Sequence, residues 1–235
     1  MTKIYYIALL LLSNLAPAQA VEGIIIYKAI KGYGDQTELS EKAKKPNYFK
    51  YTFSNQKSLQ ELISKETTTK DTTYIDGKSR DAEKLATTQT VIRNHRAIYY
   101  KDFKANIYRL ELSKKNAELI NSDISIEDKI PKYEWIIENE FQTISGFNCN
   151  KATTTRTISG RTQKIIAWFN EEIPITDGPM DFNGLPGLIL QVEINGNTLV
   201  KFEKLKLTSN KTIEIKKPEN LVQLLTIQEY FNKKK

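Results

Sequence analysis

Residues 184–189 place a turn directly before an apolar strand, and this pairing constrains the fold more than any other feature of the chain. Pro186 has a fixed φ and Gly187 accepts a positive φ, so the two residues suit the centre of a type II turn. After the turn, apolar residues alternate through residues 188–194, which is typical of a strand with one face in a core. The segment therefore predicts a rigid corner that leads into a buried strand.

A hairpin is expected to follow this strand. Asn195-Gly196 is the preferred dipeptide for a two-residue type I′ turn, and residues 198–207 are the predicted partner strand. Along the partner, the apolar residues change from one face to the other at residues 203–204. One extra residue would produce that change, so the sequence predicts a β-bulge or a bend there.

The rest of the chain indicates a mainly β protein. Apolar and aromatic runs alternate with short polar turns, which predicts the following further strands: 23–29, 48–54, 87–100, 106–112, 133–143, 151–158 and 163–170. Short loops require consecutive strands to run antiparallel. We therefore expect one domain over residues 21–235, built on a curved antiparallel sheet that forms an open or half-closed barrel.

Three segments depart from this pattern. Residues 58–65 suit either a strand or a helical turn, and residues 114–130 are polar and predicted to be irregular or briefly helical. After Pro218, leucines recur at helical spacing and the chain ends in lysines. This pattern predicts a C-terminal helix over about residues 218–232.

The N-terminus has the features of a cleaved signal peptide. Lys3 precedes an apolar run at residues 4–15, and Ala18-Gln19-Ala20 is a small-x-small cleavage site. We expect residues 1–20 to be removed and the mature chain to begin at Val21. No other run approaches the roughly 20 apolar residues of a membrane-spanning helix. The sequence thus predicts an exported protein without a transmembrane segment, located in the periplasm, at the outer membrane or outside the cell.

The stretch around the turn resembles the GLPGLI family of exported Bacteroidota proteins. The residues that carry the core of the motif are Gly178, Pro179, Gly184, Leu185, Pro186, Gly187, Leu188 and Ile189. The resemblance extends over residues 135–194 and also includes Trp135, Gly146-Phe147, Cys149, Lys151-Ala152, Ala167-Trp168-Phe169, Ile173-Pro174-Ile175 and Phe182. It implies export and a link to TonB-dependent receptors of the outer membrane. The family has no assigned catalytic residues, so the resemblance supplies no active site.

The residue inventory excludes several kinds of chemistry. Cys149 is the only cysteine and is expected to be buried, and His95 is the only histidine. A zinc site with four Cys and His ligands therefore cannot form within one chain, and any serine triad would depend on His95. The net charge of +7, or +6 without Lys3, comes from scattered lysines rather than a basic stripe with interleaved aromatic residues. We expect no nucleic-acid partner and no cofactor.

The acidic residues beside the motif are the remaining polar candidates. Asp177-Gly178-Pro179 is an ordinary turn sequence in which the carboxylate bonds to nearby backbone N–H groups. Asp177 and Asp181 are also candidate ligands for a hard cation, and a catalytic acid–base role is the less favoured alternative. A ligand site is predicted where five residues converge: Trp168, Phe182, Leu185, Pro186 and Leu188.

Three functions stay open at this point. The first is a non-enzymatic binding protein, periplasmic or associated with the outer membrane, that takes an apolar or peptide-like ligand and serves TonB-dependent uptake. The second is a hydrolase-like enzyme that uses carboxylates. The third is a structural envelope protein with a filled core.

Overall fold

The structure is a computed structural model that describes residues 19–31, 44–64, 69–75, 85–91, 95–116, 120–158, 160–209 and 211–232. Its elements are β1 (Gln19–Ala29), β2 (Asn47–Ser54), β3 (Lys57–Leu62), β4 (Thr69–Ile75), β5 (Leu85–Val91), β6 (Arg96–Asp102), β7 (Ile107–Asn116), β8 (Ile120–Asp128), β9 (Ile136–Ile144), β10 (Phe147–Ile158), β11 (Arg161–Asn170), β12 (Leu188–Ile194), β13 (Thr198–Ser209), β14 (Leu224–Leu225) and α2 (Ile227–Asn232).

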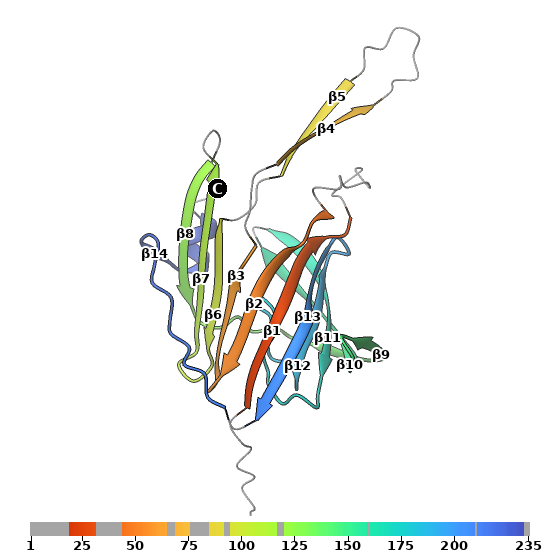
Figure 1. Ribbon diagram of the computed structural model, residues 1–235, viewed down its shortest axis with the longest axis vertical. Coiled ribbons are helices and arrows are strands. Elements are labelled where there is room, and N and C mark those ends of the chain that lie inside the picture. The colour runs from red at the N-terminus through yellow and green to blue at the C-terminus, as the bar shows by residue number, and fades with distance from the viewer. Residues whose placement is uncertain are drawn as a thin grey trace, which may run out of the picture.

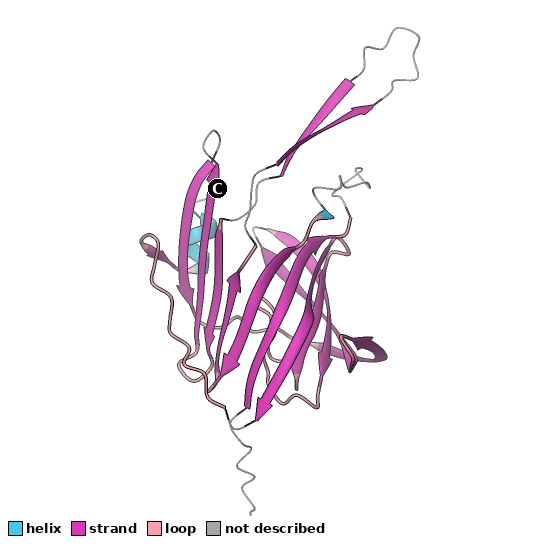
Figure 2. Cartoon of the chain, in the orientation of Figure 1, coloured by secondary structure: helices cyan, strands magenta, loops and turns pink. Residues whose placement is uncertain are grey.

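Twelve of the strands form one sheet in the order β14-β8-β7-β6-β3-β2-β1-β13-β12-β11-β10-β9. Neighbouring strands run antiparallel except β14 and β8, which are parallel. Figures 1 and 2 show that the sheet curls strongly but stays open, with β14 and β9 as its two outer strands. The prediction of a curved antiparallel sheet is confirmed in its open form. Strands β4 and β5 form a separate two-stranded sheet.

The predicted hairpin and bulge are confirmed. Asn195 and Gly196 have φ values of 53° and 66°, and the Asn197 N–H donates to the Ile194 carbonyl at 3.1 Å, as a type I′ turn requires. In β13, Glu203 is the extra residue, because Lys204 pairs with Ile24 while Phe202 pairs with Ile25. Local turn chemistry and the change of apolar face therefore specify this ribbon.

The turn before β12 differs from the prediction. Gly187 has a φ of 158°, and its N–H donates to the Leu185 carbonyl at 2.8 Å, which is a tighter turn than type II. Gly187 therefore has the predicted positive φ, and Gly184, at 90°, has one as well. The Leu188 N–H bonds to the Ile173 carbonyl at 3.1 Å instead of closing the turn. The conformation of this turn thus depends on its hydrogen bond to Ile173, shortly after β11, as much as on Pro186.

The C-terminal prediction is wrong in its extent. Only residues 227–232 are helical, and the helix begins with a capping box in which the Glu229 N–H bonds to the Thr226 hydroxyl and the Thr226 N–H to the Glu229 carboxylate. Leu224 and Leu225 instead extend the sheet beside β8. The Leu221 N–H donates to Ser125 Oγ at 2.9 Å. These contacts hold the preceding residues extended, overriding their helical spacing.

Residues 114–130 also differ from the prediction, because most of them belong to β7 and β8. The polar composition was misleading: Ser125 is fully buried in β8, where its hydroxyl donates to the Glu111 carboxylate at 2.6 Å. A strand that buries paired polar groups lacks the apolar alternation used to recognise strands. For residues 58–65, the strand alternative is confirmed by β3.

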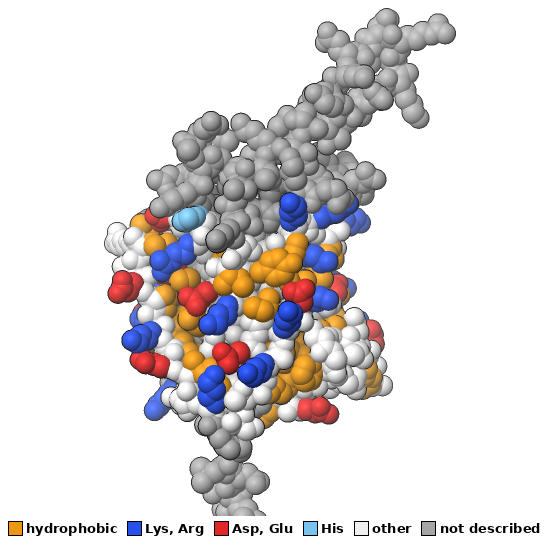
Figure 3. Space-filling view, viewed as in Figure 1, with side chains coloured by type: hydrophobic (Ala, Val, Ile, Leu, Met, Phe, Trp, Pro, Cys, Tyr) orange, Lys and Arg blue, Asp and Glu red, His pale blue; other side chains and the backbone are white. Residues whose placement is uncertain are grey.

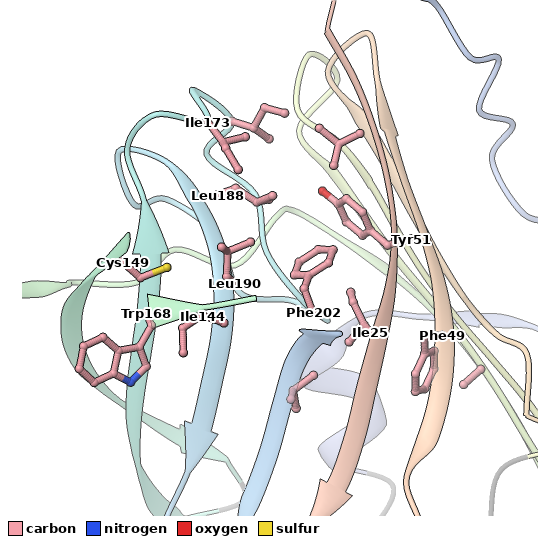
Figure 4. Close-up of a cluster of buried hydrophobic side chains, with 14 residues drawn as sticks. Ile25, Phe49, Tyr51, Ile144, Cys149, Trp168, Ile173, Leu188, Leu190 and Phe202 are labelled. Atoms are coloured by element: carbon pink, nitrogen blue, oxygen red, sulfur yellow. The ribbon is translucent and has the colours of Figure 1, made fainter. Parts of the chain in front are cut away.

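Two clusters of buried apolar side chains hold the sheet together. The larger one takes its buried strand residues from β6 to β9 in the order of the sheet and includes Ile25, Phe49, Tyr51, Leu190 and Phe202 (Figure 4). The second lies over β10, β11 and β12. On the face shown in Figure 3, basic and acidic side chains are interspersed among apolar ones.

Candidate functional site

The motif segment, residues 173–187, connects β11 to β12 and reaches strands that are distant in the chain. Its Ile173 and Ile175 pack in the larger core cluster, whereas its Phe182 and Leu185 pack in the second. The segment therefore contributes to both cores. Its polar contacts extend from there in two directions.

The first direction leads to β2 and β6 through a buried ion pair. The Lys101 ammonium contacts the Asp177 carboxylate, and the two side chains are 2% and 0% exposed. Lys101 also donates to the carbonyls of Gly178 and Phe182, at 2.9 and 3.1 Å. The Tyr51 hydroxyl donates to the other Asp177 oxygen at 2.7 Å. The predicted bonding of Asp177 to its own turn is therefore wrong, because its partners come from other strands.

This environment fixes the protonation of Tyr51. Burial, followed by the neighbouring charge and hydrogen bond of Asp177, raises the pKa of Tyr51 well above its ordinary value. The phenol thus stays protonated and donates to the carboxylate. One strand further along, Gln60 Oε1 accepts the Met180 N–H at 2.8 Å. Strands β2, β3 and β6 therefore all hold the motif segment.

The second direction leads to β10 and to the connection between β8 and β9. The Arg156 guanidinium donates to the Asp181 carboxylate at 2.9 Å and lies 4.8 Å above the centre of the Phe182 ring. The Tyr133 hydroxyl donates to Asp181 at 2.5 Å. Burial and then the charge of Asp181 raise the pKa of Tyr133, so this donor also stays protonated. Asp181 is thus a structural acceptor for two side chains.

A further set of bonds fixes the course of residues 131–135. The Trp135 indole N–H donates to the Asn183 carbonyl at 2.8 Å, and the Asn183 amide donates to the Pro131 carbonyl at 3.0 Å. The Tyr133 ring lies between its neighbours, with centroids 5.5 Å from Trp135 and 5.4 Å from Phe182. The motif segment therefore positions these two aromatic side chains.

An open groove of about 870 Å³ adjoins this aromatic pair. It is lined by Lys132, Tyr133, Glu134, Trp135, Ile136, Thr153, Thr154, Thr155, Arg156, Thr157, Thr162, Lys164 and Asn195. Aromatic rings thus adjoin a row of threonines and several charged groups. Such a lining offers both stacking surfaces and hydrogen-bond partners to a ligand.

The five residues predicted to form a ligand site do not converge. Trp168 and Leu188 pack in the larger core cluster, Phe182 and Leu185 pack in the second, and Pro186 is exposed. Phe182 comes nearest to the groove, because it lies behind Tyr133. A ligand role for these residues stays a prediction, and the groove beside them is the better candidate.

The other candidates for chemistry have structural surroundings. Cys149 is fully buried, as predicted, and burial raises the pKa of its thiol to about 11. His95 is exposed and directly precedes β6. Within the described residues, no group of three or more His, Cys, Asp or Glu side chains is arranged to hold a metal ion. No helix among these residues has the length and apolar character that a membrane crossing requires.

Sequence reasoning missed Lys101, Tyr51, Tyr133 and Arg156. Lys101 could have been suspected, because it shares a face of β6 with Ala97 and Tyr99, which pack in the core. A lysine on a core-facing side of a strand requires a buried partner. Arg156 lies among threonines and carried no comparable signal.

One family model and two solved structures are similar to parts of this chain. A family model described as a protein of unknown function (Porph_ging) matches residues 158–191, which cover β11 and the motif segment. No curated protein matches the chain. Two structures of PNGF-II, solved in different space groups, are similar to it at 17% and 15% identity and a TM-score of 0.48 in both cases. The alignments cover 84% of this chain and only 29% of PNGF-II.

Proposed function

We propose that this chain is an exported, non-enzymatic binding protein of the GLPGLI family, and that its ligand lies in the groove beside Tyr133 and Trp135. The observation that carries the proposal is the groove itself. Its volume of about 870 Å³ lies within the range of small-molecule and peptide sites. The motif segment positions the groove, because it binds the Tyr133 and Trp135 side chains that line it.

The lining favours a peptide-like ligand over an apolar one. Three threonines of β10, Thr153, Thr155 and Thr157, border the groove together with Lys132 and Lys164. Hydroxyl and ammonium groups orient a polar ligand, while Trp135 contributes apolar contact area. A purely apolar ligand would leave these polar groups without compensation for lost water.

The alternative of a carboxylate-based hydrolase receives no support from this geometry. Asp177 is neutralised by Lys101, and Asp181 by Arg156. A general acid or base needs a carboxylate that can exchange a proton with substrate at the working pH. Both carboxylates instead serve as buried or half-buried acceptors for tyrosines and cations, so a binding role accounts for them better.

Export and a link to TonB-dependent uptake complete the proposal. They rest on the signal-like N-terminus and on the GLPGLI resemblance. Fractionation of producing cells, with an antibody against the chain, tests the compartment. Loss of the protein from the cell envelope when residues 1–20 are replaced by a start methionine is the expected result, and an unchanged envelope location would contradict export by this segment.

Native mass spectrometry tests the groove. Thr155 is exposed on the groove and Thr143 is exposed on β9, away from it, so Thr155→Trp and Thr143→Trp form a matched pair. Protein purified from the producing cell should carry a ligand in the wild type and in Thr143→Trp, and lose it in Thr155→Trp. Equal ligand occupancy in all three proteins, or no ligand in any, would refute the proposal.

A further inference from the structure

One edge of β10 lacks a strand partner within the described part of the chain. Strand β9 pairs with β10 from Phe147 to Thr153, where Ile136 is the first paired residue of β9. Strand β10 continues to Ile158 and is paired there only with β11. We call residues 154–158 the free β10 edge. It adjoins the groove, because Thr153 through Thr157 contribute to the lining.

The free edge exists because the motif segment draws the chain before β9 away from the sheet. Tyr133 bonds to Asp181 and Trp135 to Asn183, so residues 131–135 do not continue along β10. The position next to residues 154–158, where a longer β9 would pair, is therefore open. At the rise of a β-strand, it has room for roughly five residues, or about 17 Å of extended chain.

An unpaired strand edge presents N–H and C=O groups that bind another extended chain. The outer edge of β9 carries features that discourage such pairing. Strand β9 bulges between Glu138 and Phe141, which pair with the consecutive β10 residues Lys151 and Asn150. The Glu138 and Glu140 carboxylates of β9 also contact Lys151. The free β10 edge has exposed threonines instead, which are favourable in strands.

The charges beside the free edge are mainly positive. Thr155 pairs directly with Lys164 of β11, so both side chains lie on the same face of the sheet. Lys132 lines the groove as well. Neither lysine forms an ion pair with another described residue, whereas the one positive guanidinium of the groove, Arg156, is already paired with Asp181. Glu134 is the single carboxylate of the lining.

We infer that the ligand of this groove is an acidic peptide segment that adds as a strand to the free β10 edge, with a carboxylate near Lys164. This inference rests on the proposed function and specifies its ligand class. The main-chain bonds supply most of the affinity, and the carboxylate supplies the preference for acidic over basic sequences.

Binding of three synthetic peptides by fluorescence anisotropy tests the inference. The first is a blocked seven-residue peptide of alternating valine and threonine with glutamate at its centre. The second has lysine at the centre, and the third keeps glutamate but is N-methylated at alternate amides, which removes strand hydrogen bonds. We expect the first peptide to bind, the second to bind at least about fivefold more weakly, and the third not to bind.

Two charge variants locate the site. Lys164→Glu should abolish the preference for the acidic peptide, whereas Lys50→Glu, at an exposed position of β2 outside the groove, should leave it unchanged. Equal binding of the N-methylated peptide would refute strand addition, and an unaltered preference in Lys164→Glu would refute the charge assignment. A non-peptide ligand found by mass spectrometry and lost in Thr155→Trp would overturn this inference while supporting the proposed function.

Discussion

Replacing Asp177 with asparagine should destabilise the fold more than any exposed charge substitution. The side chain keeps its size and can still accept from Tyr51, but Lys101 loses its counter-ion in a site where the two side chains are 2% and 0% exposed. Removing one partner of a buried ion pair costs about 3–5 kcal/mol, because the remaining charge is neither solvated nor neutralised. For a chain of this length, each kcal/mol shifts the melting temperature by about 2–4 °C.

The second half of the pair provides the decisive comparison. Lys101→Met alone should also destabilise the protein, since it leaves the Asp177 carboxylate with Tyr51 as its remaining side-chain partner. The double variant Lys101→Met, Asp177→Asn removes both charges and should lose much less stability than the sum of the two single changes. Lys211→Met is the exposed control: its partner is Glu22 at 3.2 Å, and its loss should cost no more than about 1 kcal/mol.

Urea unfolding followed by tryptophan fluorescence measures these differences, since the chain has two tryptophans. The reasoning would be refuted if the unfolding free energy of Asp177→Asn lies within about 1 kcal/mol of that of the Lys211→Met control. Additive effects of the two single variants would show that Lys101 and Asp177 stabilise the fold independently.

Three further predictions concern the motif and the core. Gly187→Ala should prevent folding or cost more than about 2 kcal/mol in urea unfolding, because its Cβ would overlap the Asn170 carbonyl oxygen. Gly184→Ala should cost only about 1–2 kcal/mol, which is the strain of its φ of 90°. Equal costs for the two variants would contradict this reasoning. Phe182→Ala should cost about 3–5 kcal/mol, and an effect below about 1 kcal/mol would contradict its place in the core. Because the pKa of Cys149 is raised from 9.0 to about 11, its contribution to stability is present below pH 9 and lost as the pH rises toward 11. The difference in unfolding free energy between wild type and Cys149→Ala should therefore fall over that range, and a constant difference would contradict the assignment.

The parts of the fold that could be predicted are those decided by residues close together in sequence. Asn195-Gly196 determines its own turn, and the change of apolar face at Glu203 reveals the bulge without knowledge of other strands. Where a backbone segment is held by distant groups, the same reasoning failed. The Leu221 N–H bonds to Ser125, about a hundred positions earlier, and this contact decided that the segment before α2 is extended.

The candidate site could be predicted only in part for the same reason. The sequence identified the motif segment and drew attention to Asp177 and Asp181, but it could not supply their partners. Lys101 and Arg156 lie on strands whose pairing order depends on the whole sheet. A carboxylate in a turn sequence has the same local pattern whether it bonds to its own backbone or to a lysine on another strand.

The two roles of the motif segment are physically coupled. Through Asp177 it holds β2 and β6, and through Asp181 and Asn183 it holds the chain that bears Tyr133 and Trp135. A change at either end that shifts the segment must therefore move the aromatic wall of the groove as well. It follows that Asp177→Asn, which touches no groove residue, should weaken peptide binding together with stability, whereas Lys164→Glu should change binding with stability nearly unaltered. Binding that is unaffected by Asp177→Asn in the folded protein would show that the motif segment closes the sheet without positioning the groove.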